Sequence, residues 1–211
     1  MFQAADGSAF SSIGEMALKT ERLNSFILAD TEKCVGCRTC EIACAIVHAA
    51  KKPMTAGAAD GPFFPRLFVM VTAEITAPVQ CRHCEDAPCA NVCQMHAISR
   101  VGDKVLVDTD RCIGCKLCLM ACAFGAIELV PRPPGSQPIY ANPLKKIKDR
   151  HGEQSFRANK CDLCTGRTEG PACVTSCPQK ALELVNAVAE TRKRKFEAAL
   201  DLQETMQDFG A

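Results

Sequence analysis

The hydrophobic residues of this chain fall into short runs of about five residues, a length typical of β-strands. Four of these runs predict strands: Ser25–Ala29, Lys104–Val107, Ala126–Val130 and Ala181–Val185. Short helices are predicted over Arg38–His48 and Lys116–Phe124. The stretch Pro62–Pro78 predicts a further hairpin or strand pair.

Three other segments depart from this pattern. Pro131–Asn159 is rich in Pro, Gly and Lys, which predicts a surface loop. Phe10–Leu23 and Ala187–Met206 each gather apolar residues on one helical face, so we expect a helix near each end of the chain. Each helix can pack on its own domain, or dock on a partner subunit or on another copy of the chain.

The chain also contains an internal repeat. Ile27–Cys44, ILADTEKCVGCRTCEIAC, matches Val105–Cys122, VLVDTDRCIGCKLCLMAC, at an offset of 78 residues throughout. Further along, Cys89–Ile98 parallels Cys173–Leu182, since both contain C-x3-C followed closely by Ala and an aliphatic residue. This alternating order predicts a duplicated unit.

The 16 cysteines among 211 residues require an explanation. Disulfides, zinc sites and iron–sulfur clusters are the three available. The first 24 residues lack the pattern of a secretory signal, and no run of about 18 apolar residues predicts a membrane span. We therefore expect a cytoplasmic protein, in which disulfides are rare and metal ligation is favoured.

The cysteines form four groups of four, with none left over. The groups, in chain order, are Cys34, Cys37, Cys40, Cys44; Cys81, Cys84, Cys89, Cys93; Cys112, Cys115, Cys118, Cys122; and Cys161, Cys164, Cys173, Cys177. Groups one and three read C-x2-C-x2-C-x3-C, the bacterial ferredoxin spacing, in which the fourth thiolate binds the other cluster. Zinc sites use separated pairs, a pattern that only group four approaches.

The distances between groups suggest how they share clusters. Eighteen residues separate groups two and three, against 36 between one and two and 38 between three and four. We therefore expect four [4Fe–4S] clusters, each held by three cysteines of one group and one of another. The expected sets are set one, Cys34, Cys37, Cys40, Cys177; set two, Cys81, Cys84, Cys89, Cys122; set three, Cys112, Cys115, Cys118, Cys93; and set four, Cys161, Cys164, Cys173, Cys44. Sequential pairing of groups one with two and three with four is the alternative.

The predicted fold is α+β. It is a duplicated bacterial two-cluster ferredoxin-like fold with short strands, short helices and long loops, plus terminal helices. The expected divisions are an N-terminal extension over 1–24, an outer module over 25–60 and 131–185, an inner module over 61–130, and a C-terminal helical extension over 186–211. Groups one and four belong to the outer module, and groups two and three to the inner one.

Glycine, basic and histidine residues lie next to the cysteines in the sequence. Gly36 and Gly114 lie inside the first turn of groups one and three, where a side chain would crowd a cluster. Six basic residues can offset cluster charge or simply be solvated beside a turn: Lys33, Arg38, Arg82, Arg111, Lys116 and Lys160. His83, between Cys81 and Cys84, is expected at the surface.

Other functions find little support. The formal charge of +1 argues against nucleic-acid binding, and the basic run TRKRK is short. The chain has no G-x-G-x-x-G, no Walker loop and no nucleophile triad. We expect a non-catalytic carrier that relays single electrons from cluster to cluster.

The segments FILADTEKCVGCRTCEIAC, CRHCEDAPCANVC, RCIGCKLCLMACAFGAIELV and ANKCDLC resemble one known family. It comprises the four-cluster ferredoxin-type subunits of molybdenum or tungsten oxidoreductases, of the formate dehydrogenase and formate hydrogenlyase type. The resemblance covers about residues 25–185 and implies a catalytic molybdenum, tungsten or hydrogenase partner. Further ferredoxin-like or flavin subunits, or copies of the chain itself, are additional implied partners. An aldehyde or other molybdenum or tungsten oxidoreductase, or a free-standing polyferredoxin, is the alternative. Pro follows the fourth cysteine only at Pro178, where the family often has it in several groups.

Overall fold

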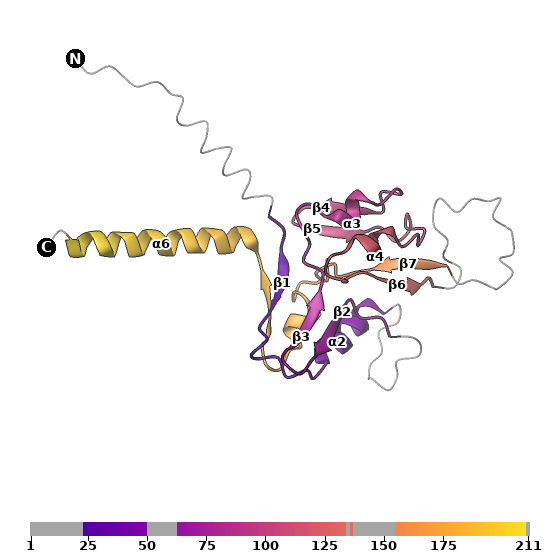
Figure 1. The fold of residues 1–211 in the computed structure, drawn as a ribbon, viewed down its shortest axis with the longest axis horizontal. Coiled ribbons are helices and arrows are strands. Elements are labelled where there is room, and N and C mark those ends of the chain that lie inside the picture. The colour runs from indigo at the N-terminus through magenta and orange to yellow at the C-terminus, as the bar shows by residue number, and fades with distance from the viewer. Residues whose placement is uncertain (1–22, 50–62, 134–135, 137–154, 210–211) are drawn as a thin grey trace, which may run out of the picture.

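The computed structural model describes residues 23–49, 63–133, 136 and 155–209 (Figure 1). This part of the chain is a small α+β protein built from short strands and helices. In chain order the elements are β1 Phe26–Ala29, α2 Thr39–His48, β2 Leu67–Val71, β3 Thr76–Gln80, α3 Pro88–Asn91, β4 Ile98–Val101, β5 Lys104–Val107, α4 Leu117–Ala121, β6 Glu128–Pro131, β7 Phe156–Asn159, α5 Ala172–Thr175, β8 Leu182–Val185 and α6 Ala187–Phe209.

The described strands pair as four antiparallel two-stranded sheets. β1 pairs with β8, from the far end of the chain, and aligns Ala29 with Leu182. β4 pairs with β5 in the same way and aligns Ile98 with Val107, the residue 78 positions after Ala29. The strand β1 therefore brings group one to group four, and β5 brings group three to group two.

Two hairpins lead into groups two and four. β3 pairs with β2 and ends at Gln80, directly before Cys81. β7 pairs with β6 and ends at Asn159, one residue before Lys160 and two before Cys161. Each hairpin thus fixes the position of the first cysteine in the group that follows it.

Cysteines make up a large part of two buried clusters. The first contains Ile27, Leu67 and Leu182 with five buried cysteines: Cys40, Cys44, Cys81, Cys161 and Cys173. The second contains Ile98, Val105, Ile127 and Ala158 with Cys112 and Cys118. Hairpin β2–β3 thus packs with the residues around group one, and hairpin β6–β7 with those around group three. The proposed module boundaries at residues 60 and 130 remain a prediction.

Most of the predicted elements are present. The strand Lys104–Val107 has the expected bounds, and β1, β8 and α2 each lie within the predicted segments. The predicted helix Lys116–Phe124 is shorter, because the backbone at Cys122 is extended and ends α4 at Ala121. The predicted helix Phe10–Leu23 lies outside the described residues, apart from Leu23.

Two strands were missed. The prediction of a loop over Pro131–Asn159 is wrong at its end, because Phe156–Asn159 forms β7 and pairs with β6. β4 was not predicted either, although it follows group two just as β8 follows group four. Both strands are only four residues long, and their pairing to a distant or adjacent strand outweighs weak local propensity.

Helix α6 extends away from the rest of the described chain (Figure 1). Its apolar side chains Phe196, Leu200, Leu202 and Met206 are exposed, so the alternative that it packs on its own domain is not supported. α6 is long but rich in charged residues. None of the helices in the described ranges has both the length and the apolar character needed to cross a bilayer.

Candidate metal centre

All 16 cysteines lie in the described part of the chain, and none forms a disulfide. Eight of them are less than a tenth exposed: Cys40, Cys44, Cys81, Cys112, Cys118, Cys161, Cys164 and Cys173. So many free thiols, half of them buried, favour metal ligation over disulfides.

The other eight are half-buried or exposed, with Cys37 and Cys115 the two exposed ones. The thiols therefore lie both in the cores and near the surface.

Three of the four expected cysteine sets each line one cavity. Three cavities are lined, respectively, by all four cysteines of sets one, two and three. In each case the fourth cysteine comes from a different group: Cys177, Cys122 and Cys93. The structure thus brings together thiols that lie far apart in the sequence.

The cysteines of set four are also neighbours. Cys44, Cys161 and Cys173 belong to one buried cluster. Burial raises the pKa of Cys173, and the charges of Cys161, Cys44 and Cys164 raise it further. Burial likewise raises the pKa of Cys161 to about 12. Thiols this close and this buried are costly to ionise unless a cation binds them.

Backbone N–H groups donate hydrogen bonds to eight of the cysteine sulfurs, over 3.3–3.4 Å. The donor and acceptor pairs are Arg66 to Cys44, His83 to Cys81, Ala97 to Cys93, Ala126 to Cys122, Ala158 to Cys112, Leu163 to Cys161, Ala172 to Cys164 and Ala181 to Cys177. Such bonds stabilise negative charge on sulfur and tune iron–sulfur clusters. These N–H donors therefore fit clusters that are bound by cysteine thiolates.

The backbone conformation explains how these bonds repeat. After Cys93, Cys122 and Cys177, the third residue has a positive φ and the N–H of the fourth donates back to the sulfur. Cys44 is the exception, because α2 continues through it to His48. Its sulfur accepts instead from Arg66, which directly precedes β2.

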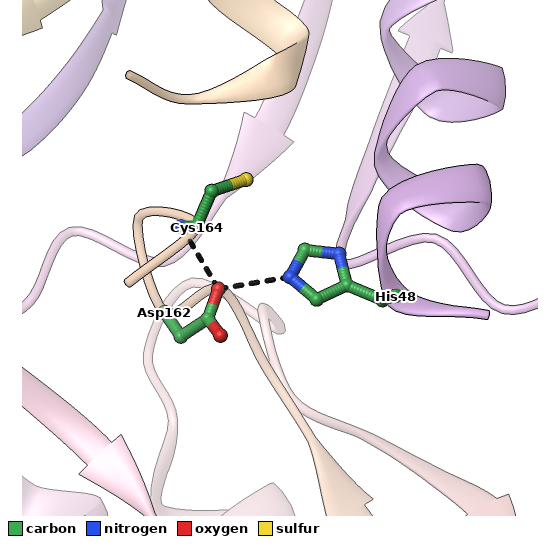
Figure 2. A group of neighbouring side chains, drawn as sticks. All are labelled: His48, Asp162 and Cys164. Atoms are coloured by element: carbon green, nitrogen blue, oxygen red, sulfur yellow. Dashed lines mark hydrogen bonds and ion pairs between the residues drawn. The ribbon is translucent and has the colours of Figure 1, made fainter. Parts of the chain in front are cut away.

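His48 joins α2 to the loop of group four (Figure 2). Its Nε2 lies 3.0 Å from Asp162 Oδ1, while Arg66 Nη1 lies 2.7 Å from Asp162 Oδ2. Burial lowers the pKa of His48, but hydrogen bonds with Asp162, Cys164 and Cys44 raise it overall to about 11. Burial raises the pKa of Asp162, but its contacts with His48 and Arg66 outweigh burial and hold that pKa well below its ordinary value.

The His48, Asp162 and Cys164 ligand atoms all lie within 4.8 Å of one another. Because His48 and Asp162 already bind each other, this cluster is an outer layer around set four rather than a separate metal site. Sequence reasoning missed His48, Asp162 and Arg66. The available signal was that Cys44 has His at the fourth following position, where the other groups have Ala.

The expectation that His83 lies at the surface is wrong. His83 is fully buried, and its Nδ1 accepts a hydrogen bond of 3.0 Å from the N–H of Val105. Burial, together with the charge of Lys160, lowers the pKa of His83 to about 3. The imidazole is therefore neutral, and its Nε2 has no hydrogen-bond partner among the described residues.

The six basic residues beside the cysteines differ in burial. Lys160 is only 3% exposed, whereas the other five are exposed: Lys33, Arg38, Arg82, Arg111 and Lys116. Solvent screens the charges of exposed side chains. Lys160 is therefore the one of the six whose charge acts at close range inside the protein.

A family profile described as a 4Fe-4S binding domain matches residues 104–127, which include group three. This match favours iron–sulfur clusters over zinc. The fold, the cysteine sets and the matched profile together define a ferredoxin-type protein that binds [4Fe–4S] clusters.

Known proteins place the chain more narrowly. It is 44% identical over 178 residues to the electron transport protein HydN of Escherichia coli K12, covering 82% of this chain and 97% of HydN. It is 39% identical over 202 residues to formate hydrogenlyase subunit 2 of the same strain, covering 89% of this chain and 93% of that subunit. The chain belongs to the ferredoxin-type iron–sulfur electron-transfer proteins of the formate hydrogenlyase type.

Among solved structures, the chain is similar to one in the BamBC active site complex of benzoyl coenzyme A reductase. The TM-score is 0.34 at 19% identity, over 76% of each chain. A score this low does not decide the fold.

Proposed function

We propose that the chain is a non-catalytic electron-transfer subunit that carries four [4Fe–4S] clusters, one in each of sets one to four. The observation that carries the proposal is that three separate cavities are each lined by four cysteines, with one cysteine of each contributed by another group. This geometry supports the interlocked sets over sequential pairing.

The electrostatic effects of the thiols on one another support a single order of centres. Beyond the effect of burial, Cys40 of set one raises the pKa of Cys173 in set four. Cys81 of set two does the same for Cys161 in set four, and Cys89 of set two for Cys118 in set three. Together with the two buried clusters, these effects support the order set one, set four, set two, set three.

In this proposal the clusters supply one-electron redox chemistry when bound. The chain's own residues bind them through cysteine sulfur, stabilise the sulfur charge through backbone N–H groups, and bury much of each site. With the clusters bound, this order of sets would provide a path for single electrons from one end to the other. In this proposal the catalytic site lies on the partner subunit.

The proposed partner is a catalytic subunit of formate dehydrogenase or hydrogenase type, and the proposed location is the cytoplasm. The support is the similarity to formate hydrogenlyase subunit 2 and to HydN. An equivalent subunit of an aldehyde or other molybdenum or tungsten oxidoreductase, or a free-standing polyferredoxin, is the alternative.

Two measurements test the proposal. The protein, purified without oxygen, should contain about 16 iron atoms per chain and accept about four electrons in a reductive titration. Zinc in place of iron, or about eight irons, would contradict the four-cluster assignment. Co-purification from the native host should yield a metal-containing oxidoreductase; a chain that elutes alone supports the polyferredoxin alternative.

A further inference from the structure

Lys160 is a buried positive charge without a carboxylate partner among the described residues. Its side chain is 3% exposed, and its Nζ donates hydrogen bonds to the carbonyls of Val105 and Cys161. Taking an ammonium out of water is costly, and carbonyl groups offset that cost only in part. A nearby negative charge is therefore expected to balance it.

The internal repeat shows that this place in the fold does not need a charge. Gln80 precedes Cys81 as Lys160 precedes Cys161, and Gln80 is also 3% exposed. Its Nε2 donates over 2.8 Å to the carbonyl of Ile27, which is the counterpart of Val105 at the offset of 78. A neutral amide thus makes the equivalent hydrogen bond. Arg82 also reaches the Ile27 carbonyl, but Arg82 is exposed and solvent screens its charge.

The charge of Lys160 lies between two cysteine sets. Its Nζ donates to the carbonyl of Val105, which lines the cavity of set two, and to the carbonyl of Cys161, a cysteine of set four. Set four and set two are adjacent in the proposed order of centres. His83, which binds the N–H of Val105, is neutral and adds no charge at this junction.

We propose that the buried ammonium of Lys160 is the shared counter-charge of the set-two and set-four clusters and raises the reduction potentials of both. This inference rests on the proposed function. One added electron makes a cluster more negative, and a buried cation beside it stabilises that state. The transfer moves one electron between neighbouring clusters, with no bond made or broken. Lys160 does not bind a cluster itself and acts through the charge of its ammonium, between set two and set four.

The test compares holoprotein variants by redox titration monitored with electron paramagnetic resonance. Lys160→Gln places at this position the side chain that its counterpart already has. It should lower the reduction potentials of two of the four clusters. For each of the two, the equilibrium between oxidised and reduced cluster should shift at least tenfold toward the oxidised form, which is 59 mV for one electron. Lys160→Arg keeps the charge and should retain potentials closer to those of the unchanged protein.

Lys33→Gln is the matched control. Lys33 directly precedes Cys34, but its side chain is 61% exposed and it pairs with Asp30 over 2.7 Å. Its replacement should shift each equilibrium by much less than tenfold. Four unchanged potentials in Lys160→Gln, or equal shifts in Lys33→Gln, would overturn the inference.

Iron analysis separates this inference from the proposed function. Fewer than four clusters in the unchanged protein would contradict the function itself. If Lys160→Gln loses clusters while Lys160→Arg keeps all four, the site requires the charge, which supports the inference. If both variants lose them, the site requires the shape of lysine, and the inference fails.

Discussion

Three glycines with positive φ offer a graded test of how closely the cysteine turns pack. In Gly114→Ala the new Cβ would lie 2.6 Å from the backbone oxygen of Phe156, in β7. In Gly36→Ala it would lie 3.0 Å from a methyl group of Thr76, and in Gly102→Ala nothing lies within 4 Å. All three glycines have φ near +60° to +70°, so each variant carries about 1–2 kcal/mol of backbone strain.

Gly114→Ala adds a steric cost, because β7 must move. Overpacking of this kind costs about 1–3 kcal/mol. The same strand places the N–H of Ala158 on the sulfur of Cys112, so its movement also weakens that bond. If the added cost falls wholly on the unfolding barrier, 1–3 kcal/mol corresponds to roughly five- to 150-fold faster loss of the clusters.

The assay follows the visible absorption of the clusters at a fixed elevated temperature without oxygen. The half-time of absorption loss should decrease in the order Gly102→Ala, Gly36→Ala, Gly114→Ala. Gly102→Ala is the control, because it carries the strain without the contact. If Gly114→Ala and Gly102→Ala lose their clusters equally fast, the close approach of β7 to the cysteine turn is refuted.

Three further changes test other parts of the account. Removing iron with a chelator should abolish stable tertiary structure, because cluster binding contributes to folding, and cooperative unfolding of iron-free protein would contradict this. Asp162→Asn leaves Arg66 and His48 without their shared carboxylate partner and should destabilise the holoprotein by about 2 kcal/mol, whereas Glu169→Gln, in an exposed pair, should cost much less. Deleting residues 187–211 should leave the iron content and visible spectrum unchanged, because the apolar side chains of α6 lie outside both buried clusters; lost iron would refute that separation.

The regular parts of the fold could be predicted because the cysteine spacing is rigid and repeats. The strand β5 and the start of α4 lie 78 residues after β1 and the start of α2, as the matching sequences require. β7 could not be found in this way, because its four residues follow a loop-like composition and gain their order from pairing with β6. Tertiary pairing of this kind is absent from local sequence patterns.

The polar residues around the sites were harder to predict than the cysteines. His83 reads locally as a surface residue, but β5 has a buried edge whose N–H and carbonyl groups need partners. His83 and Lys160 satisfy the two groups of Val105. Which polar residues serve a buried strand edge depends on contacts between segments far apart in the chain.

The most direct test of the central claim is a crystal structure of the oxygen-free holoprotein with anomalous diffraction at the iron absorption edge. The account predicts four iron clusters, with Cys177 bound beside Cys34, Cys37 and Cys40, and Cys44 beside Cys161. Clusters that pair groups one with two and three with four, or any cysteine set without iron, would contradict it.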